Sequence, residues 1–319
     1  MDISVVLPVL NEEKHIEQLV TQLIDSTSLK IELLICDAGS TDNTLAIITK
    51  LQSKFDHITL IKNAQRFVSF AFNESYKKAS GKYIALLGAH ALYPPDYLVN
   101  AFNELESKTC EAVGGPLNQV GKTSIGKAIA FAMSSKFGVG NSEFRTEKKK
   151  MYVDSVAFAV YKRTIFEKIG LFDIALKRNQ DDEIHYRIND YGYRILMIPE
   201  MACTYYVRDS FLQLFLQYFQ YGLYKPLVFA KVKSGLRVRH FVPLLFCLYL
   251  FSLPLIYFTT LWLFPLVLYG LIIVYIGFLH SKLSFKSRLL ALLCFPTLHI
   301  SYGLGCLLGL PKYANYKYK

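Results

Sequence analysis

Apolar and polar positions along the first two thirds of the chain predict strands and helices in alternation. Short apolar runs rich in β-branched residues are typical of buried strands, and we expect them at residues 3–8, 31–36, 58–62, 83–87, 153–161 and 194–198. Between them, apolar residues spaced three and four apart predict helices at 11–24, 40–51, 67–79, 163–169 and 181–191. Alternation at this spacing indicates βαβ units on a parallel sheet. Residues 1–210 are therefore predicted to form an α/β domain of the nucleotide-binding type.

Two local details complete this prediction. Asn11 is expected to cap the first helix, with Glu12 and Glu13 in its first turn, where acidic residues complement the helix dipole. Residues 117–150 are rich in Gly, Ser and Lys and show little periodicity, so we expect a mobile loop there.

The pattern changes after residue 210. Residues 211–232 predict a helix with apolar and aromatic residues on most faces, typical of one lying on a membrane surface. Residues 241–280 contain no Lys, Arg, Asp or Glu. Because one membrane span needs about 20 residues, they predict a helical hairpin that turns near Thr259 and Thr260. A third apolar segment, 289–310, contains Pro and Gly, and both a span and a re-entrant segment stay open for it.

The charge distribution adds a location. The formal net charge is +11, which is typical of proteins that bind nucleic acid, anionic lipid or phosphorylated substrates. The apolar C-terminal part favours the last two and argues against nucleic acid. Basic residues precede it directly, at Lys225, Lys231, Lys233, Arg237 and Arg239.

The orientation follows from the positive-inside rule. We predict that residues 211–240 form an interfacial segment that is amphipathic and basic. The rule places residues 231–240 and the loop at 282–288 in the cytoplasm. A third span would put the basic tail, residues 311–319, outside, which the rule disfavours. We predict a multi-pass protein of the cell (inner) membrane, with its α/β domain in the cytoplasm and transmembrane helices within 241–310.

One acidic residue follows a predicted strand directly. Asp37 precedes Gly39 and a predicted helix start. In open α/β sheets ligands bind at the carboxyl ends of strands, and His90 also falls at such an end. A carboxylate at this place can accept hydrogen bonds from a base or a ribose, while glycine lets the backbone come close. The alternative is an aspartate that only caps its own loop.

A second acidic cluster begins a predicted helix. Asp181, Asp182 and Glu183 stand in a row there, and acidic residues in a first turn complement the helix dipole. Three in a row exceed what capping needs. One of them, desolvated beside its neighbours, would have a raised pKa suited to a general base.

These motifs together resemble family 2 glycosyltransferases, whose fold is called GT-A. The matching stretches are residues 4–13, 37–42, 170–173 and 180–187. Within the family, the chain is similar to the ExoA-like enzymes of succinoglycan assembly. Those enzymes have an Asp-Ala-His triplet followed by Tyr-Pro, an Asn-Gln-Asp-Asp-Glu run, a Gln-Tyr-Phe-x-Tyr-Gly segment and C-terminal membrane helices.

The resemblance implies roles for single residues. Asp37 matches the aspartate that contacts uracil, and Ala89 and His90 match the end of the motif that holds the diphosphate metal, Mg²⁺ or Mn²⁺. Asp181 matches the catalytic base, with Asp182 as the next candidate. The rim of the nucleotide pocket matches Pro8, Leu10 and Glu12. The segment near the acceptor and the diphosphate matches Gln217, Lys225 and Arg187.

The chain departs from the family pattern at two places. Gly88 stands where the metal motif has its first acidic residue, and Gln220 and Tyr224 stand where similar proteins tend to have Arg and Trp. The first departure removes a carboxylate from the metal site. The second removes a fixed charge that would have faced the diphosphate.

The function that we predict is an inverting, membrane-anchored glycosyltransferase. It takes a sugar from a nucleotide diphosphate sugar, a UDP-sugar, and passes it to a lipid-linked saccharide or a growing polysaccharide, beside membrane lipid and other polysaccharide-assembly proteins. The alternative is a catalytically inactive relative that binds nucleotide sugar or serves as a scaffold, which the departure at Gly88 favours. A transporter component is disfavoured because the hairpin carries no charged residue to mark a pathway.

Overall fold

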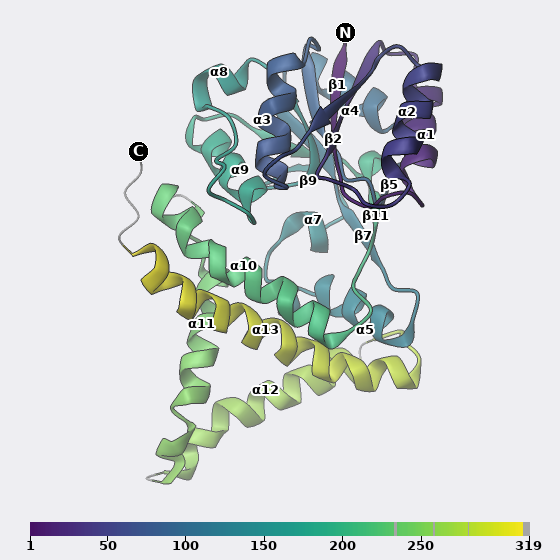
Figure 1. Cartoon of the computed structure of the whole chain (residues 1–319). Helices are drawn as coiled ribbons and strands as arrows, with labels where there is room; N and C mark the ends of the chain where they lie inside the picture. The colour runs from purple at the N-terminus through teal and green to yellow at the C-terminus, as the bar shows by residue number, and fades with distance from the viewer. Residues whose placement is uncertain (233–234, 258, 280, 315–319) are drawn as a thin grey trace. The chain divides into compact units, whose positions relative to one another are not determined.

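The computed structural model describes residues 1–232, 235–257, 259–279 and 281–314. The chain folds into two compact units (Figure 1). The first unit combines Met1–Asn118 with Glu147–Tyr205, and the second combines Gln119–Thr146 with Tyr206–Lys319. This division differs from the predicted continuous domain 1–210, because residues 119–146 belong to the second unit.

The first unit is built on an eight-stranded sheet in the order β3-β2-β1-β4-β9-β6-β10-β8. Its strands are β1 (Ile3–Val9), β2 (Ile31–Asp37), β3 (Ile58–Lys62), β4 (Tyr83–Leu86), β6 (Ala112–Gly115), β8 (Met151–Tyr152), β9 (Ala157–Lys162) and β10 (Ile195–Met197). β1 pairs in parallel with β2 and β4, and β2 with β3. The α/β prediction is confirmed. The sheet is mixed beyond these parallel strands, because β9 runs antiparallel to both β4 and β6, and β8 antiparallel to β10.

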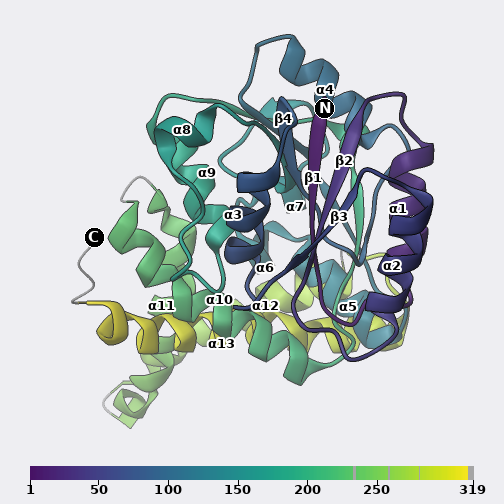
Figure 2. The same ribbon diagram turned by 45° about the horizontal axis from the view of Figure 1, so that its top comes forward.

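Helices cover both faces of this sheet. They are α1 (Ile16–Asp25), α2 (Thr44–Lys54), α3 (Val68–Lys78), α4 (Tyr97–Glu106), α8 (Ile165–Ile169), α9 (Gln180–Asp190) and the 3₁₀ helix η1 (Pro199–Met201). α1 and α2 pack together on one side of the central strands and α3 on the other (Figure 2). Covered strands must be apolar on both faces, and accordingly Val5, Val6 and Leu7 of β1 are all fully buried.

A small second sheet has the order β5-β11-β7. Its strands are β5 (Ala91–Leu92), β7 (Leu117–Val120) and β11 (Cys203–Tyr206). β5 directly follows the loop at His90, and the His90 ring lies 6.3 Å from that of Tyr205 in β11. The small sheet therefore helps to fix the backbone around His90.

The second unit is helical. Its helices are α5 (Ser124–Met133), α6 (Lys136–Val139), α7 (Glu143–Thr146), α10 (Phe211–Lys231), α11 (Val238–Phe251), η3 (Leu253–Tyr257), η4 (Thr260–Leu263), α12 (Phe264–Val274), the π-helical η5 (Tyr275–Leu279) and α13 (Phe285–Tyr313). The prediction of a loop across 117–150 is wrong. α5 buries Ala128, Ile129 and Met133 and packs on α13, so its small apolar residues serve a helix contact that a periodicity of large residues does not reveal.

Glycines set the closeness of α10 and α13, which lie side by side (Figure 1). A Cβ atom added at Gly222 would lie 2.0 Å from the carbonyl oxygen of Tyr302, and one at Gly305 would lie 2.2 Å from that of Phe219. No residue larger than glycine fits where two helix backbones touch. The third apolar segment is one continuous helix that is unbroken at Pro296. It packs closely against α10.

By length and composition, two of the described helices can cross a membrane, Thr260–Leu279 and Phe285–Tyr313. α11 has 14 residues and is shorter than a span. Thr259, where the sequence predicts the hairpin turn, lies between η3 and η4. Trp262 Nε1 donates to Ser252 Oγ across this turn at 3.0 Å. Lys233, Lys317 and Lys319 lie outside the described residues.

Candidate active site

Loops that follow three neighbouring parallel strands form the centre of the candidate site. They come after β1, β2 and β4, and because these strands are parallel, the loops leave the sheet at one edge. The register pairs Val9 with Asp37, and the backbone N–H of Ala38 donates to the carbonyl of Val9 at 2.9 Å. Pro8 and Leu10 therefore lie beside Asp37, although the chain separates them by more than 25 residues.

The first loop is tied to the second by side chains. Asn11 has a positive φ of 56°, and its Oδ1 accepts from the backbone N–H of Thr41 at 2.8 Å. Glu13 Oε2 accepts from the backbone N–H of Asn43 at 3.0 Å. The prediction that Asn11 caps the first helix is wrong, because α1 begins only at Ile16. These polar side chains instead satisfy backbone groups of the loop that follows β2.

Asp37 is buried at the end of β2, with 6% of its surface exposed. Its carboxylate accepts from the backbone N–H of Gly39 at 2.8 Å and from the hydroxyl of Ser40 at 2.5 Å. Asp37 thus does cap its own loop. It also lines a cavity of about 400 Å³, together with the aliphatic Leu60 and the guanidinium-bearing Arg66. A cavity with an apolar wall and a carboxylate suits a planar base.

Gly88 has a steric reason in this fold. A Cβ atom added there would lie 2.8 Å from Cε1 of Phe158. Phe158 has φ 53°, an uncommon conformation for a bulky residue that surrounding contacts must hold. The hydroxyl of Tyr97 donates to the Phe158 carbonyl at 2.5 Å, and the Tyr93 ring lies 5.4 Å from the Phe158 ring. An aspartate at position 88 would therefore collide with the Phe158 ring.

His90 has a carboxylate partner from the other loop. Its Nδ1 lies 3.1 Å from Oε1 of Glu12. The His90 side chain is 55% exposed, whereas that of Glu12 is only 14% exposed. The imidazole is therefore open to solvent, and the carboxylate beside it is mostly covered. Ala89 is buried. The fold thus brings Glu12, predicted for the rim of the nucleotide pocket, to the residue predicted to bind metal.

This pair has donor chemistry that suits a divalent ion. Imidazole and carboxylate both ligate Mn²⁺, and Mg²⁺ or Mn²⁺ in nucleotide sites takes one or two protein ligands plus phosphate oxygens and waters. Neighbouring ligands about 2.1 Å from an octahedral ion stand about 3 Å apart, close to the observed spacing. Within the described part of the chain, no group of three or more His, Cys, Asp or Glu converges.

The acidic cluster opens α9, as predicted. Asp181 and Asp182 are half-buried, whereas Glu183 is fully buried. Glu183 forms two hydrogen bonds with Arg187, from Nε at 2.7 Å and from Nη2 at 2.8 Å. Arg187 also donates to the carbonyls of Ile169 and Leu171. Although Arg187 was expected near the acceptor and diphosphate, its guanidinium joins α9 to the chain that follows α8.

Strand β9 places this cluster at the edge where the other loops meet. Because β9 is antiparallel to β4, its first residue lies where β4 ends. Ser155 stands just before β9, and its hydroxyl lies 3.4 Å from Oδ1 of Asp182. The start of α9 therefore shares an edge with His90, and Asp37, Glu12 and Asp181 belong to one face of the first unit.

Two buried residues, His185 of α9 and Tyr161 of β9, were not predicted from the sequence. His185 Nδ1 lies 3.0 Å from the Ser155 hydroxyl, and its Nε2 lies 2.9 Å from that of Tyr161. Burial lowers the pKa of His185 to about 4, so its imidazole is neutral near pH 7. Burial first, and then the nearby Asp181 carboxylate, raise the pKa of Tyr161 well above its usual value. The only available signal was a histidine among the apolar positions of a predicted helix.

The remaining predicted residues lie on α10 of the second unit. Lys225 is buried, with 4% exposed. Gln217 Nε2 donates to the hydroxyl of Tyr221 at 3.0 Å, one turn along the same helix. The ring of Tyr224 lies 6.1 Å from that of Tyr313 in α13. α10 packs on α13 along its length. The contact with α13 therefore fixes the position of the helix that carries these residues.

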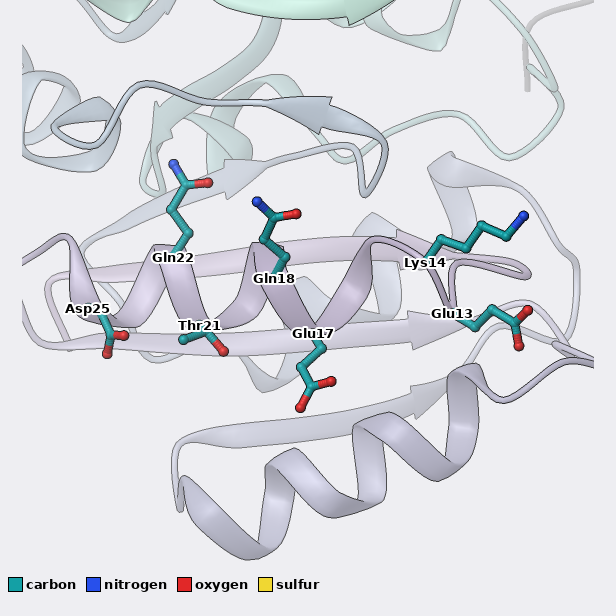
Figure 3. A pocket seen from close by; sticks show the side chains of 7 residues that line it. All are labelled: Glu13, Lys14, Glu17, Gln18, Thr21, Gln22 and Asp25. Atoms are coloured by element: carbon teal, nitrogen blue, oxygen red, sulfur yellow. The ribbon is translucent and has the colours of Figure 1, made fainter.

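A further hollow, of about 540 Å³, runs along α1 (Figure 3). Seven polar residues of α1 and its approach line it, from Glu13 to Asp25. Their side chains fan out around the helix and do not converge on one point (Figure 3).

Comparison with known proteins gives these features a class. The α/β fold carries polar side chains at the carboxyl edge of its sheet, and the family model described as glycosyl transferase family 2 matches residues 4–170. The chain therefore belongs to glycosyl transferase family 2 and is a glycosyltransferase. The GT-A fold, the family and the enzyme class that the sequence motifs predicted are confirmed.

Relatives and one solved structure agree with this assignment. The succinoglycan biosynthesis protein ExoA of Rhizobium meliloti is 32% identical over 75% of this chain and 74% of its own length. A Methanococcus voltae protein, dolichyl N-acetyl-alpha-D-glucosaminyl phosphate 3-beta-D-2,3-diacetamido-2,3-dideoxy-beta-D-glucuronosyltransferase, is 31% identical over 72% and 74%. The mannosyltransferase PcManGT of Pyrobaculum calidifontis, solved with GDP-Man and Mn²⁺, shares the fold at a TM-score of 0.60 and 20% identity, covering 97% of this chain and 86% of that one.

Proposed function

We propose that this glycosyltransferase transfers a sugar with inversion from a UDP-sugar to a lipid-linked saccharide or polysaccharide acceptor at a membrane. The observation that carries the proposal is the single edge that holds the Asp37 cavity, the Glu12–His90 pair and the start of α9. The cavity would take the base, and the pair would lie near the diphosphate. The acidic helix start would lie on the acceptor side.

In this mechanism Asp181 is the general base. The acceptor hydroxyl attacks the anomeric carbon from the side opposite to the leaving UDP, and the configuration at that carbon inverts. Asp181 accepts the hydroxyl proton as the new C–O bond forms and the bond to the diphosphate breaks. Half-burial of the carboxylate limits competition from water, which suits a base that must meet one hydroxyl.

Glu12 and His90 would hold the divalent ion. When bound, such an ion neutralises charge that develops on the departing diphosphate. At position 88 a glycine stands where the metal motif has an acidic residue. The Glu12 carboxylate, from the loop after β1, stands beside His90 and would replace it. This replacement favours an active transferase over the inactive relative that Gly88 had suggested.

The acceptor and location are proposed from the second unit and the relatives. Two helices suited to crossing a membrane would hold the enzyme at the cytoplasmic face of the inner membrane, where a lipid-borne acceptor is presented. One relative is named for succinoglycan biosynthesis and another for a dolichyl-linked sugar. Both names support an acceptor of this kind and an environment of other polysaccharide-assembly proteins.

The test is a transfer assay on membranes that contain the full chain, with radiolabelled UDP-sugars and GDP-mannose as alternative donors. We expect label to move from one UDP-sugar into a lipid-extractable or polymeric product. Transfer from GDP-mannose alone would refute the donor assignment. Label found only in free sugar, with no saccharide product, would refute the acceptor assignment.

Asp37→Ala is expected to weaken UDP binding by about 1–3 kcal/mol, because a buried hydrogen-bond acceptor for the base is lost. Calorimetric titration of the purified chain with UDP measures this. Ser40→Ala is the matched control, since it removes the loop's hydroxyl bond to Asp37 and keeps the carboxylate. Equal losses in the two variants would mean that Asp37 serves only its loop.

Glu12→Gln and His90→Ala are each expected to lower Mn²⁺ affinity at least about tenfold. Loss of a group that only supports a metal ligand already lowers metal affinity by about 10–100-fold. Electron paramagnetic resonance of free Mn²⁺, with saturating UDP, measures this without turnover. The imidazole should also make Mn²⁺ preferred over Mg²⁺. Glu17→Gln, on the exposed face of α1, is the control. Wild-type Mn²⁺ binding in both site variants would remove the pair from the metal site.

A further inference from the structure

A buried chain of hydroxyl and imidazole groups connects strand β9 with the acidic start of α9. We propose that Ser155 and His185 are positioning residues that hold the Asp182 carboxylate and thereby leave the role of base to Asp181. This inference rests on the proposed transfer reaction. It adds a function to Ser155 and His185, to which the resemblance assigns no role.

The chain of contacts crosses from the sheet to the helix. The Tyr161 hydroxyl on β9 lies 2.9 Å from His185 Nε2, His185 Nδ1 lies 3.0 Å from the Ser155 hydroxyl, and that hydroxyl lies 3.4 Å from Asp182 Oδ1. Tyr161 and His185 are each 1% exposed, and Ser155 is 5% exposed. Water therefore has little access to these groups, and each polar atom must be satisfied by its neighbour.

The Asp182 carboxylate, at the end of this series of hydrogen bonds, determines which group donates at each link. An ionised carboxylate only accepts hydrogen bonds, so the single Ser155 proton points to Asp182. The Ser155 oxygen then accepts from His185, which places the imidazole proton on Nδ1. His185 Nε2 is left as an acceptor, and the Tyr161 hydroxyl donates to it. All three links are consistent with one neutral tautomer of His185.

The consequence separates the two carboxylates. Successive residues of an α-helix point about 100° apart, so Asp181 and Asp182 face different surroundings from adjacent positions. Asp182 accepts from the Ser155 hydroxyl, the last donor of the buried series. Its carboxylate is thereby held as part of the support for α9, which leaves Asp181, at the same helix start, as the base.

The kinetic test compares Ser155→Ala with Ser155→Thr in the full chain. Ser155→Ala removes the hydroxyl, and we expect kcat to fall about ten- to hundredfold, as for a small misplacement of reacting groups, with KM for the donor within about twofold. Ser155→Thr keeps the hydroxyl and should restore most of kcat. A Thr variant as impaired as the Ala variant, or an Ala variant with wild-type kcat, would overturn the proposal.

A spectroscopic test needs no substrate. The ¹⁵N spectrum of histidine-labelled full chain in detergent, with His185→Gln to identify the signal, should show a neutral imidazole protonated at Nδ1. Asp182→Ala frees the Ser155 proton for Nδ1 and should move the imidazole proton to Nε2. A wild-type signal protonated at Nε2, or no change in Asp182→Ala, would overturn the proposed direction. Failure of the wild type to transfer any sugar would instead count against the proposed function, and the spectrum would still report on the chain.

Discussion

Asp181→Asn is expected to reduce kcat about 10²–10⁴-fold, the usual contribution of a general base, while UDP affinity stays within about twofold. Asparagine keeps the shape of the side chain and does not accept a proton. Because the acceptor hydroxyl and not the nucleotide meets this residue, the loss should fall on the chemical step alone. Transfer assays with saturating donor, paired with UDP titration, measure both quantities.

The same helix offers a matched control. Asp190 lies exposed at the other end of α9, and Asp190→Asn should retain wild-type kcat. Asp182→Asn should be intermediate, because its amide oxygen can still accept from Ser155. If Asp181→Asn turns over at close to the wild-type rate and Asp182→Asn does not, the base is Asp182 and the positioning chain has been assigned to the wrong carboxylate.

Gly305→Ala should destabilise the second unit by ~3 kcal/mol or more. Its Cβ atom would lie 2.2 Å from the Phe219 carbonyl and 2.8 Å from the Leu223 backbone nitrogen. Overpacking usually costs about 1–3 kcal/mol when side chains can adjust, but here the obstacles are backbone atoms of α10. The two helices must therefore move apart, which also disturbs the setting of Gln217 and Lys225.

Gly270→Ala is the control for this substitution. Gly270 lies in the apolar helix α12, and a Cβ atom there meets nothing within 4 Å. Alanine favours helix over glycine by about 1 kcal/mol, so this variant should be as stable as wild type or more so. Thermal unfolding followed by circular dichroism in detergent compares the three proteins. Equal midpoints for Gly305→Ala and wild type would show that α10 and α13 are less closely packed than the structure indicates.

Much of the site was predictable because parallel strands end at one edge. Asp37 follows the apolar run of β2, and His90 follows that of β4, so strand periodicity alone placed both at the carboxyl edge. The acidic start of α9 was visible as three carboxylates before a helical pattern. These predictions depended on local sequence, since a strand's end and a helix's first turn are set by neighbouring residues.

Local sequence misled where small or polar residues had distant partners. The helix α5 lacks a strong stripe of large apolar residues because its small side chains pack closely on α13. Asn11 has the composition of a helix cap, yet its side chain serves the loop after β2. In both cases the deciding contact comes from a segment about 30 residues away or more, and a periodicity rule does not include it.

The sequence by itself determined the α/β class, the family, the edge of the sheet that carries the chemistry and the apolar C-terminal helices. Only the tertiary structure decided which side chains meet. It set Glu12 beside His90, filled the space at Gly88 with Phe158 and joined Tyr161, His185 and Ser155 to Asp182. The physical reason is that sheet register and the antiparallel course of β9 fix these contacts between residues 24 to 78 positions apart, and such distances are set by packing of the whole unit.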